Sequence, residues 1–318
     1  MPRWSVLLLT MLACALGLAA CGGDDDVDVQ QVLRETFGGK KGIKSGRLDA
    51  GLRLDLSGLA QLRGPVRFSL SGPFETAGRD AVPKFDFDAK VDAGGDTFTA
   101  GAVSTGDKGF IEIQGQTVAI PDEQFQRYRE LLAQDASAGD EGGVSFKSLG
   151  IDPQRWLRSP EYAGKEEVGG AETIHIRAGI DVERLLDDVN RVLARAEQVE
   201  GDRARQLTEE ERRQLGEAIE NARLELWTGE EDRILRRINV KLGFELPESA
   251  RQRANGLTSG TISFDLAFGA INEEQEIRAP ENAQPAGGGG GGASEYERCV
   301  QQAGSDVSEL QKCAALAG

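Results

Sequence analysis

Residues 47–57 read RLDAGLRLDLS, and this stretch decides the fold. Apolar side chains recur at every second position, and charged or polar ones stand between them. Successive side chains of a β-strand point to opposite faces, so a period of two predicts a strand with one apolar face and one wet face. The alternating apolar positions are Leu48, Ala50, Leu52, Leu54 and Leu56.

The same alternation recurs along the chain. It is clear at residues 66–70, 85–91, 234–246 and 262–268, and the stretches 97–104, 109–114, 116–120 and 173–180 predict further strands. Gly94-Gly95-Asp96 marks a hairpin turn between two of them. The tally is about ten strands, and one-sided alternation is typical of an antiparallel sheet with one face in solvent.

Helical patterns are fewer. Asp28 caps a first helix, Pro121 begins a second, Asp152-Pro153 opens a short one, and Asp181 caps the longest. Thr208 and Glu211 form a capping box for a helical segment that we extend to Ala222.

These patterns predict an α+β fold, a curled antiparallel half-barrel with its helices on the concave side. The helices are too few to cover the whole sheet, so we expect an incompletely filled apolar cavity. Its lining is predicted from the alternating positions Leu54, Phe68, Phe87, Ile238, Val240, Phe264 and Phe268.

The first hydrophobic run ends in Leu18-Ala19-Ala20-Cys21, the pattern of a lipobox. Its apolar stretch of about fifteen residues suits a signal peptide and is short for a membrane span, which needs about twenty. We therefore expect a signal peptide at 1–20, palmitate-class acyl chains on Cys21 and an acidic tether at 21–27. Two or more chains anchor a protein stably, where one is marginal. An unlipidated secreted protein is the alternative.

Export also bears on the remaining cysteines. With Cys14 in the signal peptide and Cys21 lipidated, Cys299 and Cys313 are left, and an oxidising compartment favours their pairing. A Pro/Gly linker at 279–294 separates them from the main domain at 28–278. We expect 295–318 to form a helical hairpin closed by this disulfide, which contributes about 3 kcal/mol. The hairpin either docks a protein partner or is a terminal stub.

Charge excludes one class of partner. The 318-residue chain carries a formal net charge of −16 at pH 7, with no basic stripe to meet phosphates, so no nucleic-acid role is expected. An acidic surface is not attracted to anionic lipid headgroups either, which leaves the acyl anchor as the contact with the membrane.

Catalytic patterns are absent. His175 is the only histidine, and its place between Ile174 and Ile176 puts it on the wet side of its strand, facing solvent. The sequence has no G-x-S-x-G motif, zinc-site spacing or P-loop, so we predict no cofactor and no enzyme. Asp86, Asp88 and Asp92 are the carboxylates that would suit a calcium site. Because Lys84 and Lys90 are interspersed with them, we favour a solvated sheet face and predict no metal.

Several stretches together resemble a known family between Val29 and Ile277. They are Gly42-Ile43-Lys44-Ser45-Gly46 before the first long strand, the segment GKEEVGG at 164–170, and Leu224-Glu225-Leu226-Trp227 shortly before residues 233–237. With the lipobox, this layout resembles the LppX/LprG (LprAFG) lipoproteins, which are similar in fold to LolA and LolB. The resemblance implies a half-barrel that holds acyl chains of lipids or glycolipids and acts as a carrier without catalysis.

The sequence thus predicts a lipoprotein anchored to the cell membrane, facing outside the cytoplasm, that binds or carries a lipid or glycolipid in an apolar cavity. A structural or protein-interaction lipoprotein with a filled core is the alternative. An envelope hydrolase that uses a pair of carboxylates is a third possibility.

Overall fold

The computed structural model describes residues 27–38, 42–60, 62–76, 82–136, 152–200, 205–252, 254–285 and residue 299. The predicted signal peptide, Cys21 and Cys313 lie outside these residues, and so does most of the predicted hairpin. Cys299 is a half-buried helical residue. Because Cys313 lies outside the described residues, the pairing of the two cysteines stays a prediction.

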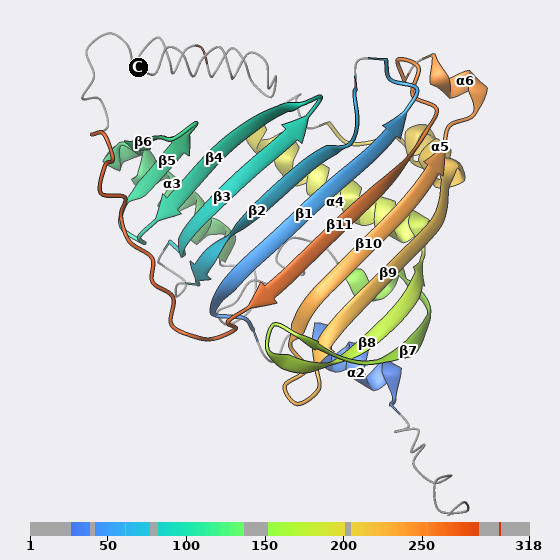
Figure 1. Cartoon of the computed structure of the whole chain (residues 1–318), viewed down its shortest axis with the longest axis horizontal. Coiled ribbons are helices and arrows are strands. Elements are labelled where there is room, and N and C mark those ends of the chain that lie inside the picture. Colours follow the sequence, from blue (N-terminus) through green and yellow to red (C-terminus); the bar gives the residue numbers. More distant parts are fainter. Residues whose placement is uncertain are drawn as a thin grey trace, which may run out of the picture.

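The described strands form one open, strongly twisted antiparallel sheet, which confirms the α+β class (Figure 1). Its 11 strands follow the order β6-β5-β4-β3-β2-β1-β11-β10-β9-β8-β7. Their bounds are β1 (Ser45–Ser57), β2 (Val66–Glu75), β3 (Lys84–Ala93), β4 (Asp96–Ser104), β5 (Gly109–Ile113), β6 (Gln116–Ala119), β7 (Leu157–Val168), β8 (Ala171–Ile180), β9 (Ile219–Gly229), β10 (Leu235–Glu245) and β11 (Ser259–Gly269).

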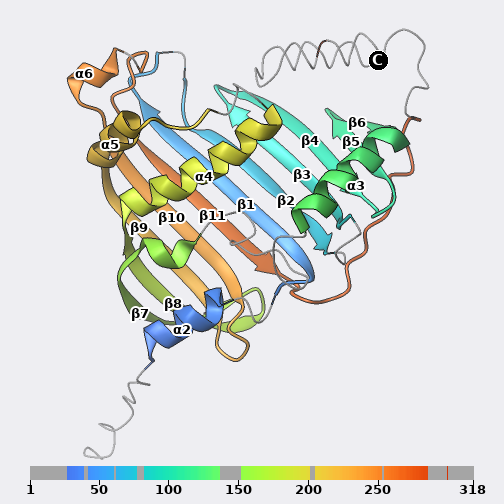
Figure 2. The ribbon, with the colours of Figure 1, turned by 180° about the vertical axis from the view of Figure 1, so that it is seen from behind.

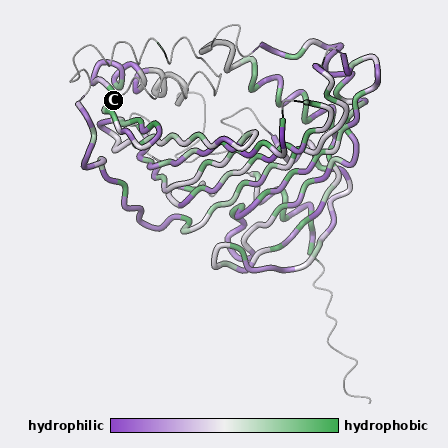
Figure 3. Tube along the Cα trace, turned by 45° about the horizontal axis from the view of Figure 1, so that its top comes forward, coloured by the Kyte–Doolittle hydropathy of each residue, from purple (hydrophilic) through white to green (hydrophobic). Residues whose placement is uncertain are grey.

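The stretch RLDAGLRLDLS forms most of β1, near the middle of the sheet. Its neighbours are β2 and β11, and the pairing matches apolar residues with apolar residues, because Leu52 lies opposite both Phe68 and Phe264. A shift of one residue would turn every apolar side chain to the wrong face, so the alternation fixes this register. Figure 3 shows hydrophilic and hydrophobic residues alternating along the strands.

Two strands differ from the prediction. The sequence pattern does not predict β7, because this edge strand has few apolar residues and shifts register twice against β8. The helix predicted to reach Ala222 ends at Ala218, and β9 begins at Ile219. The reason is tertiary pairing, since Leu224 and Leu226 lie opposite Val240 and Ile238 of β10.

The helices are α2 (Val29–Phe37), α3 (Asp122–Ala136), the 3-10 helix η1 (Pro153–Trp156), α4 (Val182–Glu200), α5 (Glu209–Ala218) and α6 (Glu248–Arg251). Helices α2, α3 and α4 lie on one face of the sheet, and α6 lies beyond the strand ends (Figure 2). Asp28 caps the first by accepting from the backbone N of Gln31 at 3.0 Å, and the predicted capping box of Thr208 and Glu211 is present. No helix of the described residues is long and apolar enough to cross a membrane.

The core lies at one end of the sheet, where α2, η1 and α4 pack against β8, β9 and β10. Leu33 of α2 is 1% exposed, and Ile176, Leu224 and Leu226 of the strands are 0% exposed. Burying one such side chain contributes about 1.5–3 kcal/mol, so this half of the sheet carries most of the packing energy.

The chain crosses back to the other end of the sheet after β11 (Figure 1). There Gln284 forms a parallel bridge with β6, donating to Thr117 O and accepting from Ala119 N, both at 2.9 Å. The first part of the segment that the sequence assigned to a linker is therefore docked on the edge strand.

Candidate functional site

The side of the sheet that carries the helices has a continuous layer of apolar side chains, which we call the apolar face. Two rows of paired residues define it. The first row is Ala178, Leu224, Val240, Phe264, Leu52, Phe68, Val91 and Phe98, and the second is Ile176, Leu226, Ile238, Leu266, Ala50, Leu70, Ala89, Ala100 and Ile113.

Burial falls along these rows from one end to the other. In the first row Leu224 is 0% exposed and Val240 9%, whereas Phe68 is 39% exposed. Ile111 of β5 and Val118 of β6, which pair with each other on the same side, are 44% and 37% exposed. The apolar face is thus filled over β8–β10 and accessible over β2–β6.

Small residues lower the middle of the accessible half. Ala89 and Ala100 are neighbours in the second row, where the filled half has leucine and isoleucine. Beside them Phe85 and Phe87 of β3 stack with ring centroids 5.1 Å apart. An alanine fills less of the layer between sheet and helix, so this part of the face lies lower than its phenylalanine surroundings.

Helix α4 crosses the sheet above the apolar face (Figure 2). Leu185 and Leu186, in its first half, are each 8% exposed, whereas Val189 and Val192 further along are 39% and 38% exposed. At 3.6 residues per turn, Val192 points within about 20° of Leu185 and Val189 within about 40°. The stripe that packs at one end of α4 therefore continues, uncovered, toward the accessible half of the sheet.

Hydrogen bonds to two other segments fix the position of α4. Asn190 donates to Leu207 O at 3.2 Å and accepts from Leu207 N at 2.7 Å, so the segment before α5 runs along the helix. Asp188 is buried and accepts from Asp152 N at 2.7 Å and from Trp156 Nε1 at 3.1 Å, which attaches η1 to α4. These bonds hold α4 in place over the sheet.

All seven residues predicted to line a cavity belong to the apolar face, in two groups. Ile238, Val240 and Phe268 are 2%, 9% and 9% exposed and belong to the core. Leu54, Phe87 and Phe264 are half-buried, and Phe68 is exposed.

Sequence reasoning missed four accessible residues, Ile111, Val118, Val189 and Val192. The two valines of α4 stand in its apolar stripe, but the sequence gives no sign that half of the stripe stays uncovered. Ile111 and Val118 lie in short strands, where the alternation is weak.

Two pockets of the described residues lie away from the expected apolar cavity. One, of about 550 Å³, lies on the opposite side of the sheet between β7, β8 and β9. The other, of about 430 Å³, is lined by the ends of β1 and β11 and by Gly64 and Pro65.

His175 lies on the polar side of β8 as expected, but the prediction that it faces solvent is wrong, because it is 2% exposed. Its ring stacks on Trp227 with centroids 4.3 Å apart, Nε2 lies 2.8 Å from Glu225 Oε2, and Nδ1 lies 3.0 Å from Glu166 Oε1. Arg237 lies 5.2 Å from the centroid of the Trp227 ring. Trp227, a large aromatic residue on the polar side of β9, is the signal in the sequence that could have indicated that His175 is covered.

The remaining carboxylates give no metal site. Partial burial raises the pKa of Asp86, and the negative charges of the neighbouring Asp88 and Glu112 raise it further. Among the described residues, no three His, Cys, Asp or Glu side chains are placed to hold a metal ion. Asp86 and Asp88 alternate with the apolar residues of β3, so they lie on the polar side, away from α4.

No family model and no curated protein matches this chain. Among solved structures it is similar to the lipoprotein LppX of Mycobacterium tuberculosis, with 11% identity, 79% of this chain and 100% of LppX covered, and a TM-score of 0.33. LprF from Mycobacterium bovis matches with 14% identity, 80% and 97% coverage and a TM-score of 0.34.

The matches thus include the lipoprotein group that the sequence resembles. A LolA superfamily protein from Nitrosomonas europaea also matches, with 8% identity, 79% and 95% coverage and a TM-score of 0.19. None of these three names denotes an enzyme, as the sequence analysis expects. All three overlaps are loose, and what this chain binds follows from its own side chains.

Proposed function

We propose that this protein is a membrane-anchored envelope lipoprotein that binds acyl chains of a lipid or glycolipid between α4 and the accessible half of the apolar face. One observation carries the proposal: α4 crosses above the apolar face (Figure 2), and exposed apolar side chains occur on both. Phe68 of the sheet is 39% exposed, and Val189 and Val192, in the stripe of α4 that begins with the buried Leu185, are 39% and 38% exposed. Contiguous exposed apolar surface marks binding sites in soluble domains.

The chemistry of such a site is burial. Each methylene removed from water contributes about 0.8 kcal/mol, and no directed polar group is needed to hold an acyl chain. The small side chains of the adjacent Ala89 and Ala100 fill less of the layer above the sheet than leucine would, which favours an acyl chain there. Binding and release then require no bond-making step, in keeping with a carrier and not with an enzyme.

The proposed anchor would hold the filled end of the sheet near a membrane. Cys21 precedes Asp28, the cap of α2, by seven residues, and a fully extended segment of that length reaches about 25 Å. α2 lies at the β7–β8 end of the molecule (Figure 1). That end would stay close to the bilayer, while the accessible half of the apolar face, over β2–β6, would lie toward the other end of the sheet.

Native mass spectrometry of residues 22–318, which contain every described element, tests ligand binding. We expect adducts of lipid mass that dissociate on activation, and saturable binding of a fluorescent fatty acid by the delipidated protein. The variant Ala89→Trp fills the low middle of the face and should lose both signals.

The matched control is Ser69→Trp, a tryptophan at an exposed position on the polar side of the sheet, which should bind like the parent. If the parent carries no lipid and ignores fatty acids, the chain is instead a structural or interaction lipoprotein.

The anchor has its own test. The Cys21→Ala chain should move from the membrane fraction to the soluble fraction and lose the mass of its acyl chains. Unchanged fractionation would contradict lipidation at this position without touching the proposal for the apolar face.

A further inference from the structure

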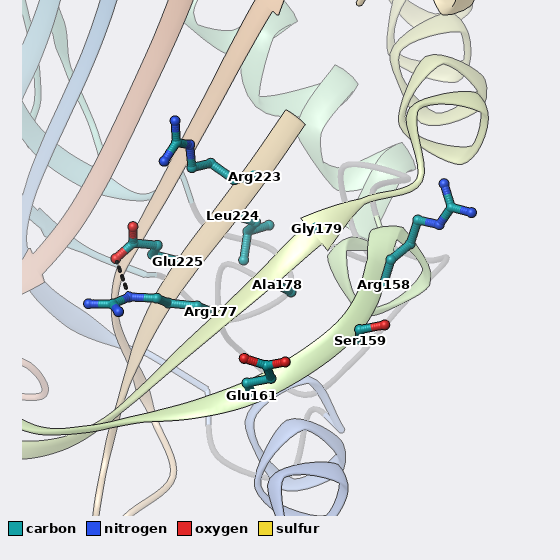
Figure 4. A pocket seen from close by; sticks show the side chains of 9 residues that line it. All are labelled: Arg158, Ser159, Glu161, Arg177, Ala178, Gly179, Arg223, Leu224 and Glu225. Carbon is teal, nitrogen blue, oxygen red and sulfur yellow. Dashed lines mark ion pairs between the residues drawn. The ribbon is translucent and has the colours of Figure 1, made fainter. Parts of the chain in front are cut away.

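The larger pocket of the described residues lies on the polar side of the sheet, away from α4. It has a volume of about 550 Å³ and is formed by β7, β8 and β9 (Figure 4). Three arginines line it, Arg158, Arg177 and Arg223, one from each strand. Three cationic side chains at one pocket are unusual in a chain with a net charge of −16.

The register of the sheet brings two of these arginines together. Gly179 of β8 pairs with Arg158 on one side and with Arg223 on the other. Neighbouring strands lie about 4.8 Å apart, so the two arginine backbones are roughly 10 Å apart across a residue without a side chain. Figure 4 shows Arg158 and Arg223 on either side of Gly179.

The charges of these arginines are poorly balanced within the fold. Arg158 and Arg223 are exposed and form no ion pair with the residues that the structure describes, while Arg177 lies 3.5 Å from Glu225. Arg223 also pairs directly with Lys241 of β10, and like charges directly opposite each other destabilise a sheet. Glu161 and Glu225 line the pocket too and leave the three arginines in excess by one charge.

The backbone at the rim of the pocket is irregular. Ser159 has a φ of +46°, and the pairing of β7 with β8 shifts register between Arg158 and Glu161. A left-handed residue other than glycine costs of order 1–3 kcal/mol and is concentrated at ligand clamps. The bulge turns the edge strand outward beside Gly179 and brings the Ser159 hydroxyl to the pocket.

We infer that this pocket binds a phosphate group, held by Arg158 and Arg223 over Gly179 with Arg177 and the Ser159 hydroxyl beside them. Guanidinium groups bind phosphate through paired, charge-assisted hydrogen bonds, which suits two arginines without partners. An anion here would also offset the repulsion between Arg223 and Lys241. The group could be free inorganic phosphate or the phosphomonoester headgroup of a lipid, and the inference does not rest on acyl-chain binding by the apolar face.

The experiment has two arms, each run on residues 22–318 at constant ionic strength. The first titrates inorganic phosphate by calorimetry. The second measures co-sedimentation with phosphatidylcholine vesicles that contain phosphatidic acid, against vesicles of phosphatidylcholine alone.

Two variants remove the site. Arg158→Gln/Arg223→Gln removes the cations, and Gly179→Leu fills the floor, where an added Cβ lies 3.6 Å from Arg158 O, an ordinary contact. Arg47→Gln/Arg67→Gln is the control, since it makes the same charge change on the same side of the sheet outside the pocket.

A site for free phosphate is supported if the parent binds phosphate saturably in the first arm. The affinity should then be at least tenfold weaker in the double variant and unchanged in the control. Binding in the second arm alone, with the same dependence on the variants, would support a lipid headgroup. The inference is overturned if neither arm shows binding, or if the double variant and the control behave alike. If Gly179→Leu fails to fold, the double variant decides the outcome. The Ala89→Trp variant should keep phosphate binding, which separates this site from the apolar face.

Discussion

Replacing Phe68 with alanine removes the largest accessible side chain of the apolar face. Phe68 lies in the middle of β2, opposite Leu52 of β1 and Val91 of β3, and 39% of it is exposed. A bound acyl chain on the accessible half of the sheet would cover that exposed part of the ring.

The structure sets the size of the effect. A phenylalanine side chain presents roughly 200 Å², of which the exposed 39% leaves about 80 Å² for a ligand to cover. At about 25 cal/mol per Å², this contact contributes about 2 kcal/mol to binding, or about a thirtyfold change in Kd. The rest of the ring is packed in the folded protein, so Phe68→Ala should also lower the free energy of unfolding by up to about 3 kcal/mol.

The assay is a fluorescent fatty-acid titration, with urea unfolding of each variant measured in parallel. Tyr162→Ala is the control, because Tyr162 has the same exposure of 39% but lies on edge strand β7, six strand positions away. We expect the control to bind within twofold of the parent. The proposed site is refuted if the two variants weaken binding equally, or if neither does while both remain folded.

Three further predictions concern the fold around the site. Leu226→Ala, at a position 0% exposed, should lower the free energy of unfolding by about 2–5 kcal/mol in urea denaturation. Asp188→Ala leaves Trp156 Nε1 without its buried acceptor and should cost about 3–5 kcal/mol, whereas Asp187→Ala, which removes a half-buried ion pair with Arg212, should cost about 1 kcal/mol. Because burial raises the pKa of Asp86, its ionised form opposes folding above the unfolded pKa of about 3.9. Asp86→Asn should therefore unfold at a higher urea midpoint at pH 7, and this advantage should vanish as the pH falls below that value; an equal midpoint at pH 7 would contradict the assignment.

Much of the fold follows from local sequence. The alternation in residues 47–57 predicts β1 and its apolar side, and the same pattern gives most other strands within a residue or two. Caps at Asp28 and Thr208 are also local, because each side chain bonds a backbone N–H three residues ahead. Two strands resisted this reasoning: β7 lacks alternation at its edge position, and β9 has a beginning that also suits a helix.

The candidate sites depend on which segments, far apart in the chain, pack against each other. The sequence by itself determined that the sheet has one apolar side and that the seven predicted lining residues share it, because side-chain direction in a strand depends on position alone. Only the tertiary structure decided that Val240 is buried while Phe68 is accessible, since Val240 belongs to the core that α2, η1 and the first half of α4 pack against. It also decided that His175 is buried under Trp227, and that Arg158 and Arg223 flank Gly179. Those outcomes depend on strand order and register, which are set by pairing between segments far apart in the chain.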